Sequence, residues 1–153
     1  MLDSIRPDTS FGCCKLRIYR SPELESAQNG YSIGTNGESL TGDEDGDWSR
    51  NWVVIGYDDT SGDPLFIDTS EEGYPVYTAM IGQGRWDRQR IAVSLTGFSH
   101  ALSAIAAVAE GREHPVTLEQ NPLTQSEGDN VLASIRQQNP NMDVRFWETL
   151  LSS

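Results

Sequence analysis

The residues with the clearest chemical potential are acidic side chains gathered in one part of the chain. Between Glu38 and Glu72 there are 11 acidic residues and one basic residue, Arg50, so this segment carries −10 of the formal net charge of −12. The other residues nearly balance, with 12 acids and 10 bases. Charge concentrated in this way attracts a basic partner and repels nucleic acids and anionic membranes. The simplest alternative is a solvated surface that only favours solubility.

Three of these acids alternate along the chain, which is a spacing typical of calcium-binding loops. Asp43, Asp45 and Asp47 could occupy the first ligand positions of an EF-hand loop. Such a loop also needs glycine at its sixth position and glutamate at its twelfth. Those positions hold Trp48 and Val54. The motif is therefore incomplete, and we expect no dedicated calcium site.

The sequence also lacks a recognisable catalytic arrangement. The two histidines, His100 and His114, have no partner at the spacing of a transition-metal site. Ser99 adjoins His100, but neighbouring residues on a helix point in different directions. No GxSxG, phosphate-binding or dinucleotide-binding motif is present. We expect no enzyme activity, no metal and no cofactor. A hydrolase using paired carboxylates of the acidic segment is the weaker alternative.

Length and composition predict one domain. The chain has 153 residues, of which 37% are hydrophobic, enough for a sizeable core. Its longest apolar run, 104–109, is far shorter than the roughly 20 residues that span a bilayer. Residues 1–16 contain no basic region followed by an apolar core, so we expect no secretory signal. Cys13 and Cys14 are adjacent, and adjacent cysteines rarely form an unstrained disulfide. We therefore expect a reduced, cytoplasmic protein in which both cysteines pack as small apolar side chains.

The middle of the chain predicts an antiparallel sheet. Three apolar runs, 52–56, 64–68 and 75–81, are separated by short polar turns that contain glycine. No segment between them is long enough for the crossover helix that a parallel sheet needs. An earlier strand is predicted around 16–19. A polar loop follows at 32–49, and its few apolar residues predict that it is mobile, or held only by edge contacts, in the free protein.

The second half of the chain predicts helices on one face of this sheet. One apolar stripe starts at Ile91, and Gly111 marks the end of its helix. A capping box at 126–129 predicts the next helix, and a last short helix contains Trp147. The expected class is α+β, with a helical C-terminal third. One core between sheet and helix is predicted from Val54, Ile55, Phe66, Ile67, Val76, Leu95, Phe98, Leu102 and Ile105.

The central motifs resemble those of the SUKH superfamily, which includes fungal regulators of cell-wall synthesis and bacterial immunity proteins against polymorphic toxins. The resemblance rests on 52–56, 62–68 and 75–77, then on Trp86 in a glycine-containing loop and on 91–98. It covers about residues 48–102 of one domain spanning 1–153, with 112–153 as a helical C-terminal extension. What the resemblance implies is a non-enzymatic α+β binding module.

The acidic segment and the resemblance together favour an immunity protein. A nuclease toxin must be basic to hold phosphates, and an acidic inhibitor would complement that surface. We expect a protein partner of this kind, with no nucleic acid and no membrane. A regulatory or scaffold module without a toxin partner is the alternative. The predicted contact residues are Asp43, Glu44, Asp45, Asp47, Asp58 and Asp59, with Trp48 and Trp86 as aromatic contacts.

Overall fold

Six strands form one sheet in which each strand pairs with its neighbour in sequence. The structure is a computed structural model that describes residues 2–152. Every pairing is antiparallel, so the predicted meander is confirmed, and a further strand is added at each edge. The strands are β1 (Asp8–Phe11), β2 (Cys14–Ile18), β3 (Trp52–Asp58), β4 (Pro64–Asp68), β5 (Val76–Gly82) and β6 (Arg85–Ala92).

The last two strands are joined by a tight turn. Gln83 and Gly84 both have positive φ angles, 54° and 76°, as a type I′ hairpin turn requires. The turn carries β6 back along β5 and makes β6 the outer strand of the sheet. Gly82 to Gly84 therefore connect two strands and do not form a phosphate-binding loop.

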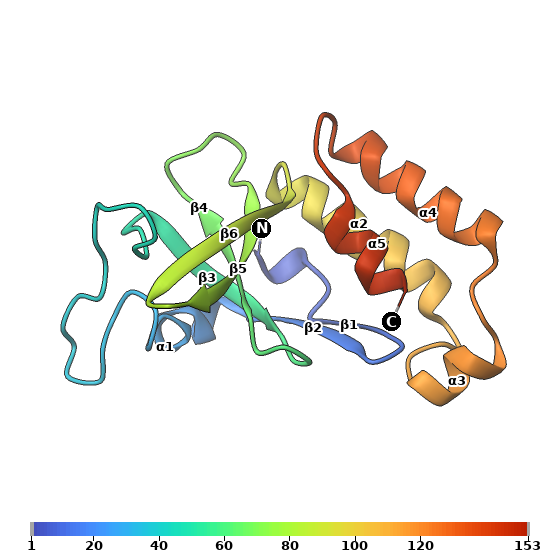
Figure 1. The fold of residues 1–153 in the computed structure, drawn as a ribbon, viewed down its shortest axis with the longest axis horizontal. Coiled ribbons are helices and arrows are strands. Elements are labelled where there is room, and N and C mark those ends of the chain that lie inside the picture. The colour runs from blue at the N-terminus through green and yellow to red at the C-terminus, as the bar shows by residue number, and fades with distance from the viewer. Residues whose placement is uncertain (1, 153) are drawn as a thin grey trace.

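The helices from Leu95 onward follow the sheet in sequence and gather at one end of it (Figure 1). This confirms an α+β domain with a helical C-terminal third. Residues 29–51 run on the other side of the sheet from the helical layer (Figure 1). The helices are α1 (Leu24–Ala27), α2 (Leu95–Ala109), α3 (Pro115–Gln120), α4 (Gln125–Gln138) and α5 (Arg145–Leu151), with short 3-10 turns at Leu2–Ser4 and Ser21–Glu23. No helix within 2–152 is both long and apolar enough to span a membrane.

The start of α2 corrects the sequence prediction. Ile91 lies in β6, and the helix begins only at Leu95. Ser94 is the reason, since its side-chain oxygen accepts a hydrogen bond from the Gly97 N–H at 2.9 Å and so caps the helix. Gly111, with φ of 77°, follows the end of the helix as predicted.

The link between α2 and α4 is more ordered than the sequence predicted. It contains α3, which begins at Pro115. The capping box of α4 uses Thr124 and Glu127, two residues before the predicted start at Ser126. Arg112 is buried beneath this link and donates to both carboxylate oxygens of Glu127 at 3.1 Å.

The sheet has a core on each face, whereas one core was predicted. Successive side chains of a strand point to opposite faces, so Val54 and Ile55 belong to different cores, as do Phe66 and Leu65. The helix-side core contains the α2 stripe and Trp147. The loop-side core consists of Trp48, Trp52, Val54, Phe66, Tyr77 and Ala79, with Tyr19, Tyr31 and Trp86 packed against it.

Candidate protein-binding surface

Trp48 fixes the most acidic part of the chain against the sheet. Its side chain is 2% exposed and packs against rings from several segments. The ring centroid lies 4.7 Å from that of Phe66 and 5.1 Å from those of Tyr31, Trp52 and Trp86. Aromatic pairs at such distances add stabilisation beyond their buried area. One tryptophan thus holds the polar segment in place.

Hydrogen bonds then close residues 42–48, here called the acidic loop, into a compact turn. The Gly42 N–H donates to the Trp48 carbonyl oxygen, and the Asp47 N–H donates to that of Glu44, both at 3.0 Å. The Glu44 N–H in turn donates to Asp47 Oδ2 at 3.0 Å. The Asp47 carboxylate is therefore hydrogen-bonded within the loop, while Asp43, Glu44 and Asp45 are exposed at its tip.

The acidic loop is also attached to the outer strand β6. The Trp86 N–H donates to the Gly46 carbonyl oxygen at 2.8 Å, and Asp45 forms an ion pair with Arg85 at 2.9 Å. Gly46 has a φ of 91°, and a Cβ at this position would approach Arg85 carbon atoms to 3.1 Å. Glycine is therefore required at position 46, both for the left-handed backbone and for the close approach.

Between the acidic loop and the sheet lies an open cavity of about 400 Å³. Its walls combine carboxylates with aromatic rings, which suits a cationic group. One wall is formed by residues 42–47 and Ser49. The rest of the lining comes from the sheet: Trp52, Asp68, Trp86, Asp87 and Arg88.

Arg88 shows how a guanidinium sits at this surface. Its Cζ lies 4.4 Å from the ring centroid of Tyr77 and 5.4 Å from that of Trp52. One guanidinium nitrogen donates to Asp68 Oδ2 at 3.3 Å. Burial alone would raise the pKa of Asp68, but hydrogen bonds from the Ser70 hydroxyl and amide, together with Arg88, outweigh it and hold this pKa below its usual value. The carboxylate is therefore charged at neutral pH.

The remaining predicted acids lie elsewhere, which corrects the expectation of one contact surface. Asp58 is the last residue of β3, six residues and roughly 20 Å of extended strand from Trp52, and Asp59 follows it. Asp58 Oδ1 accepts a hydrogen bond from the Thr60 N–H at 2.9 Å, and Asp59 pairs with Arg17 at 3.6 Å. The structure thus brings Asp43, Glu44, Asp45 and Asp47 together and leaves these two apart.

The predicted aromatic contacts also need correction. Trp48 is buried, so its side chain cannot be an exposed anchor for a partner. Trp86 is half-buried and lines the cavity. Asp68 and Arg88 were not predicted. Asp68 could have been predicted, because it ends the expected strand 64–68 and lies opposite Trp52 in the neighbouring expected strand. Arg88 could not, because it lies on a strand that was not predicted.

Other reactive groups do not form a site of this kind. Within residues 2–152, no cluster of three or more His, Cys, Asp or Glu side chains is arranged to hold a metal ion. Cys13 is exposed, and Cys14 is buried in the helix-side core. Burial, aided by Asp58, raises the pKa of the Cys14 thiol to about 12, so this thiol is not a nucleophile at neutral pH.

Comparisons of the chain with protein-family models, with curated proteins and with solved structures found no match. The feature that stands out is an acidic loop that is held by a buried tryptophan and placed beside an aromatic and carboxylate-lined cavity.

Proposed function

We propose that this chain is a non-enzymatic, SUKH-type immunity protein whose acidic loop binds a basic, nuclease-type toxin domain. The observation that carries the proposal is the burial of Trp48, which holds three exposed carboxylates at the loop tip in a defined position. A loop that served only solubility would gain nothing from being anchored in this way.

The anchoring lowers the ordering cost of binding. A mobile loop would lose conformational freedom on contact with a partner, and that loss weakens affinity. Here the loop is already closed by its own hydrogen bonds and attached to β6 through Gly46. Electrostatic attraction from Asp43, Glu44 and Asp45 can then act on the approach of a partner and on its orientation.

The cavity beside the loop supports recognition of cationic side chains. Trp86 offers a half-buried ring next to the carboxylates, and so takes the role predicted for Trp48. Arg88 already stacks on Tyr77 and Trp52 while paired with Asp68. An arginine or lysine from a partner would meet the same chemistry at the rim.

A nuclease-type partner follows from the charge. A nuclease concentrates Lys and Arg at its active site to hold phosphates. A protein that covers that site with carboxylates competes with nucleic acid for the same cations. Inhibition then needs no catalytic residue on the inhibitor, which agrees with the absence of a nucleophile–base pair in the sequence.

The test is growth rescue by co-expression. The neighbouring genes are searched for a basic nuclease-type toxin domain, and that domain is expressed in cells with the wild-type chain, or with an Asp43→Asn/Glu44→Gln/Asp45→Asn variant. We expect the wild type to restore growth and the variant to fail while remaining folded. Rescue by the variant at the wild-type level, or the lack of any toxin gene beside this one, would contradict the proposal. The second result would favour the regulatory alternative.

A further inference from the structure

Strand β6 leaves part of its backbone unpaired. It is an outer strand of the sheet and pairs only with β5. The Trp86 N–H points away from β5, because it donates to Gly46. Along an antiparallel strand, the backbone N–H and C=O groups of successive residues face alternately toward the paired strand and away from it. Arg88 and Arg90 therefore direct these groups away from β5, as Trp86 does. No hydrogen bond from elsewhere in residues 2–152 reaches these four groups.

Both ends of this open stretch are closed by other parts of the chain. At one end the acidic loop covers Trp86. At the other end Trp147 Nε1 donates to the Ile91 carbonyl oxygen at 2.8 Å, and the pairing with β5 shifts by one residue at this point. The open stretch is therefore 87–90. An edge of this length admits a short extended segment but not a long strand.

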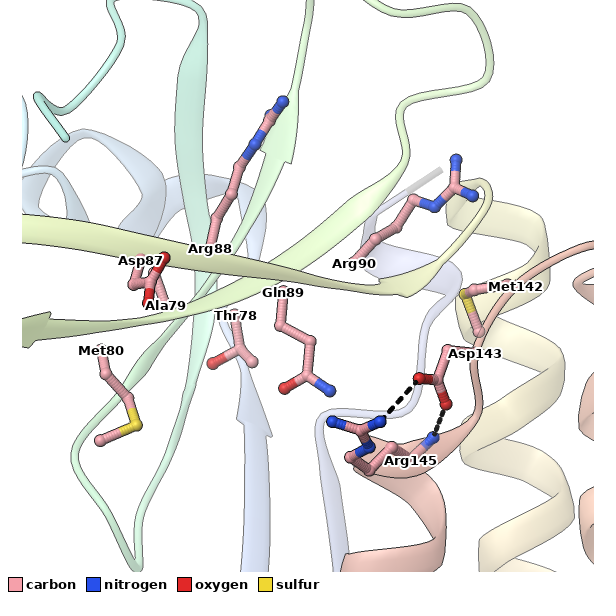
Figure 2. A pocket seen from close by; sticks show the side chains of 10 residues that line it. All are labelled: Thr78, Ala79, Met80, Asp87, Arg88, Gln89, Arg90, Met142, Asp143 and Arg145. Atoms are coloured by element: carbon pink, nitrogen blue, oxygen red, sulfur yellow. Dashed lines mark hydrogen bonds and ion pairs between the residues drawn. The ribbon is translucent and has the colours of Figure 1, made fainter. Parts of the chain in front are cut away.

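A cavity of about 570 Å³ runs beside the open stretch (Figure 2). Arg88 and Arg90 point to one side of β6, and Gln89 points to the other side, toward Arg145 (Figure 2). The hairpin tip next to this cavity carries Met80, which is 67% exposed, and Ile81, which is 60% exposed. Backbone groups, the exposed Met80 side chain and cations thus lie at one edge.

The charges at this edge select among possible occupants. Arg85, Arg88 and Arg145 each pair with an aspartate, whereas within 2–152 no ion pair joins Arg90 to a carboxylate or Asp87 to a base. Asp87 and Arg90 alternate to opposite sides of β6, so Arg90 is the unpaired charge on its side of the open stretch. A segment carrying carboxylates would complement Arg90. A second copy would not, because antiparallel pairing of two β6 strands about Arg88 places arginine opposite arginine in chains of net charge −12.

We propose that the open stretch of β6 is a docking edge for an extended, acidic segment of a partner protein. The segment adds a strand to the sheet through the outward groups of Arg88 and Arg90. Its alternate side chains are acidic on the side of Arg90 and apolar on the side of Met80 and Met142. This inference does not depend on the proposed toxin partner, whose surface is basic.

The test uses the full chain, labelled with ¹⁵N, and capped peptides as probes. Peptide Glu-Val-Glu-Val-Glu is titrated to millimolar concentration, and Lys-Val-Lys-Val-Lys serves as its control. We expect chemical-shift changes at the amides of 87–90 with the acidic peptide and none with the basic one. Arg90→Glu should raise the dissociation constant of the acidic peptide about five-fold, the size expected for loss of one exposed charge pair. Arg6→Glu makes the same charge change at an exposed residue outside this edge and should have little effect.

Several outcomes would overturn the proposal. These are the absence of shifts at 87–90, equal binding of the basic peptide, and an equal effect of Arg6→Glu and Arg90→Glu. Analytical ultracentrifugation tests whether a second copy of the chain occupies the edge, by measuring the oligomeric state. A dimer of the wild type that dissociates in the Arg90→Glu variant would assign the edge to a second copy of the chain.

Discussion

The two faces of the sheet are closed in different ways. On one face, α2, α4 and α5 contribute many apolar side chains to the helix-side core, so no single residue holds it together. On the other face, a polar segment contributes Trp48 to a small aromatic core. Burial is distributed on the first face and concentrated on the second. The helix side therefore supports the fold, whereas the loop side holds an exposed charged loop in place with few apolar residues.

The largest effect is expected on the helix side. Phe98 is fully buried and packs against Trp147, with ring centroids 6.2 Å apart. Phe98→Ala should lower the free energy of unfolding by about 3–5 kcal/mol, as for other large core truncations. Chemical denaturation measures this value. A loss under about 1 kcal/mol, typical of a surface change, would show that this core is not the main support of the fold.

Trp48→Ala should be nearly as costly but local in its consequences. We expect the free energy of unfolding to fall by about 3 kcal/mol. This is the lower end for such truncations, because the loop can relax and fill part of the cavity. Hydrogen exchange of the acidic loop should become fast, while α2 keeps its protection. Trp48→Phe, which keeps an aromatic ring, is the matched control and should restore most of the protection. Uniform acceleration across both faces would mean that the two cores are not separable.

Asp68 should make the stability of the loop-side core depend on pH. Its folded pKa lies below its unfolded value, so its stabilising contribution is present above the unfolded pKa and is lost as pH falls through the folded pKa. Asp68→Asn should lower the free energy of unfolding by about 1–2 kcal/mol at pH 7, since Arg88 loses its charged partner. Unfolding measured from pH 7 to pH 2 should show a smaller acid-induced loss in the variant. Parallel curves would exclude Asp68 as a source of the pH dependence.

The smallest effect should come from the ion pair on the outside of the loop. Arg85 and Asp45 side chains are 60% and 96% exposed, so solvent and salt screen their attraction. Arg85→Ala should change the free energy of unfolding by less than about 0.5 kcal/mol. A loss comparable with that of Trp48→Ala would show that the loop is held by its charges and not by the burial of Trp48.

The sheet was predictable from sequence because its signals are local. Apolar runs of strand length and glycine-containing turns define β3 to β5 and their antiparallel order. Strand β6 was missed in part because Arg85 to Arg90 are almost all polar, as an outer strand allows, and because Ile91 fits the helical stripe of α2. Tertiary pairing with β5, and not residue type, decides this segment.

The candidate site was predictable in charge but not in geometry. The acidic residues are visible in the sequence, yet nothing local shows that Trp48 turns inward while Asp43 and Asp45 turn outward. That outcome depends on rings from three distant segments, Tyr31, Phe66 and Trp86, meeting Trp48 on the sheet. For the same reason, the expectation of a mobile loop at 32–49 missed its attachment through Trp48 and Gly46.

The central claim is that the acidic loop attracts a basic partner, and the association rate constant tests it most directly. The rate is measured by stopped flow with the proposed partner, a basic nuclease-type toxin domain, at low and at physiological ionic strength. The account predicts that Asp43→Asn/Glu44→Gln/Asp45→Asn slows association about ten-fold or more at low salt, with a smaller effect on dissociation. The difference should shrink at physiological ionic strength, where the Debye length is roughly 8 Å.

A matched variant distinguishes the effect of charges in the acidic loop from the effect of net charge on the association rate. Glu110→Gln/Glu119→Gln/Asp129→Asn removes the same three charges from exposed positions on the helical part of the chain. It should slow association much less than the loop variant does. Equal rates for the two variants, or association that is independent of salt, would contradict the claim and leave the acidic loop as a solvated surface.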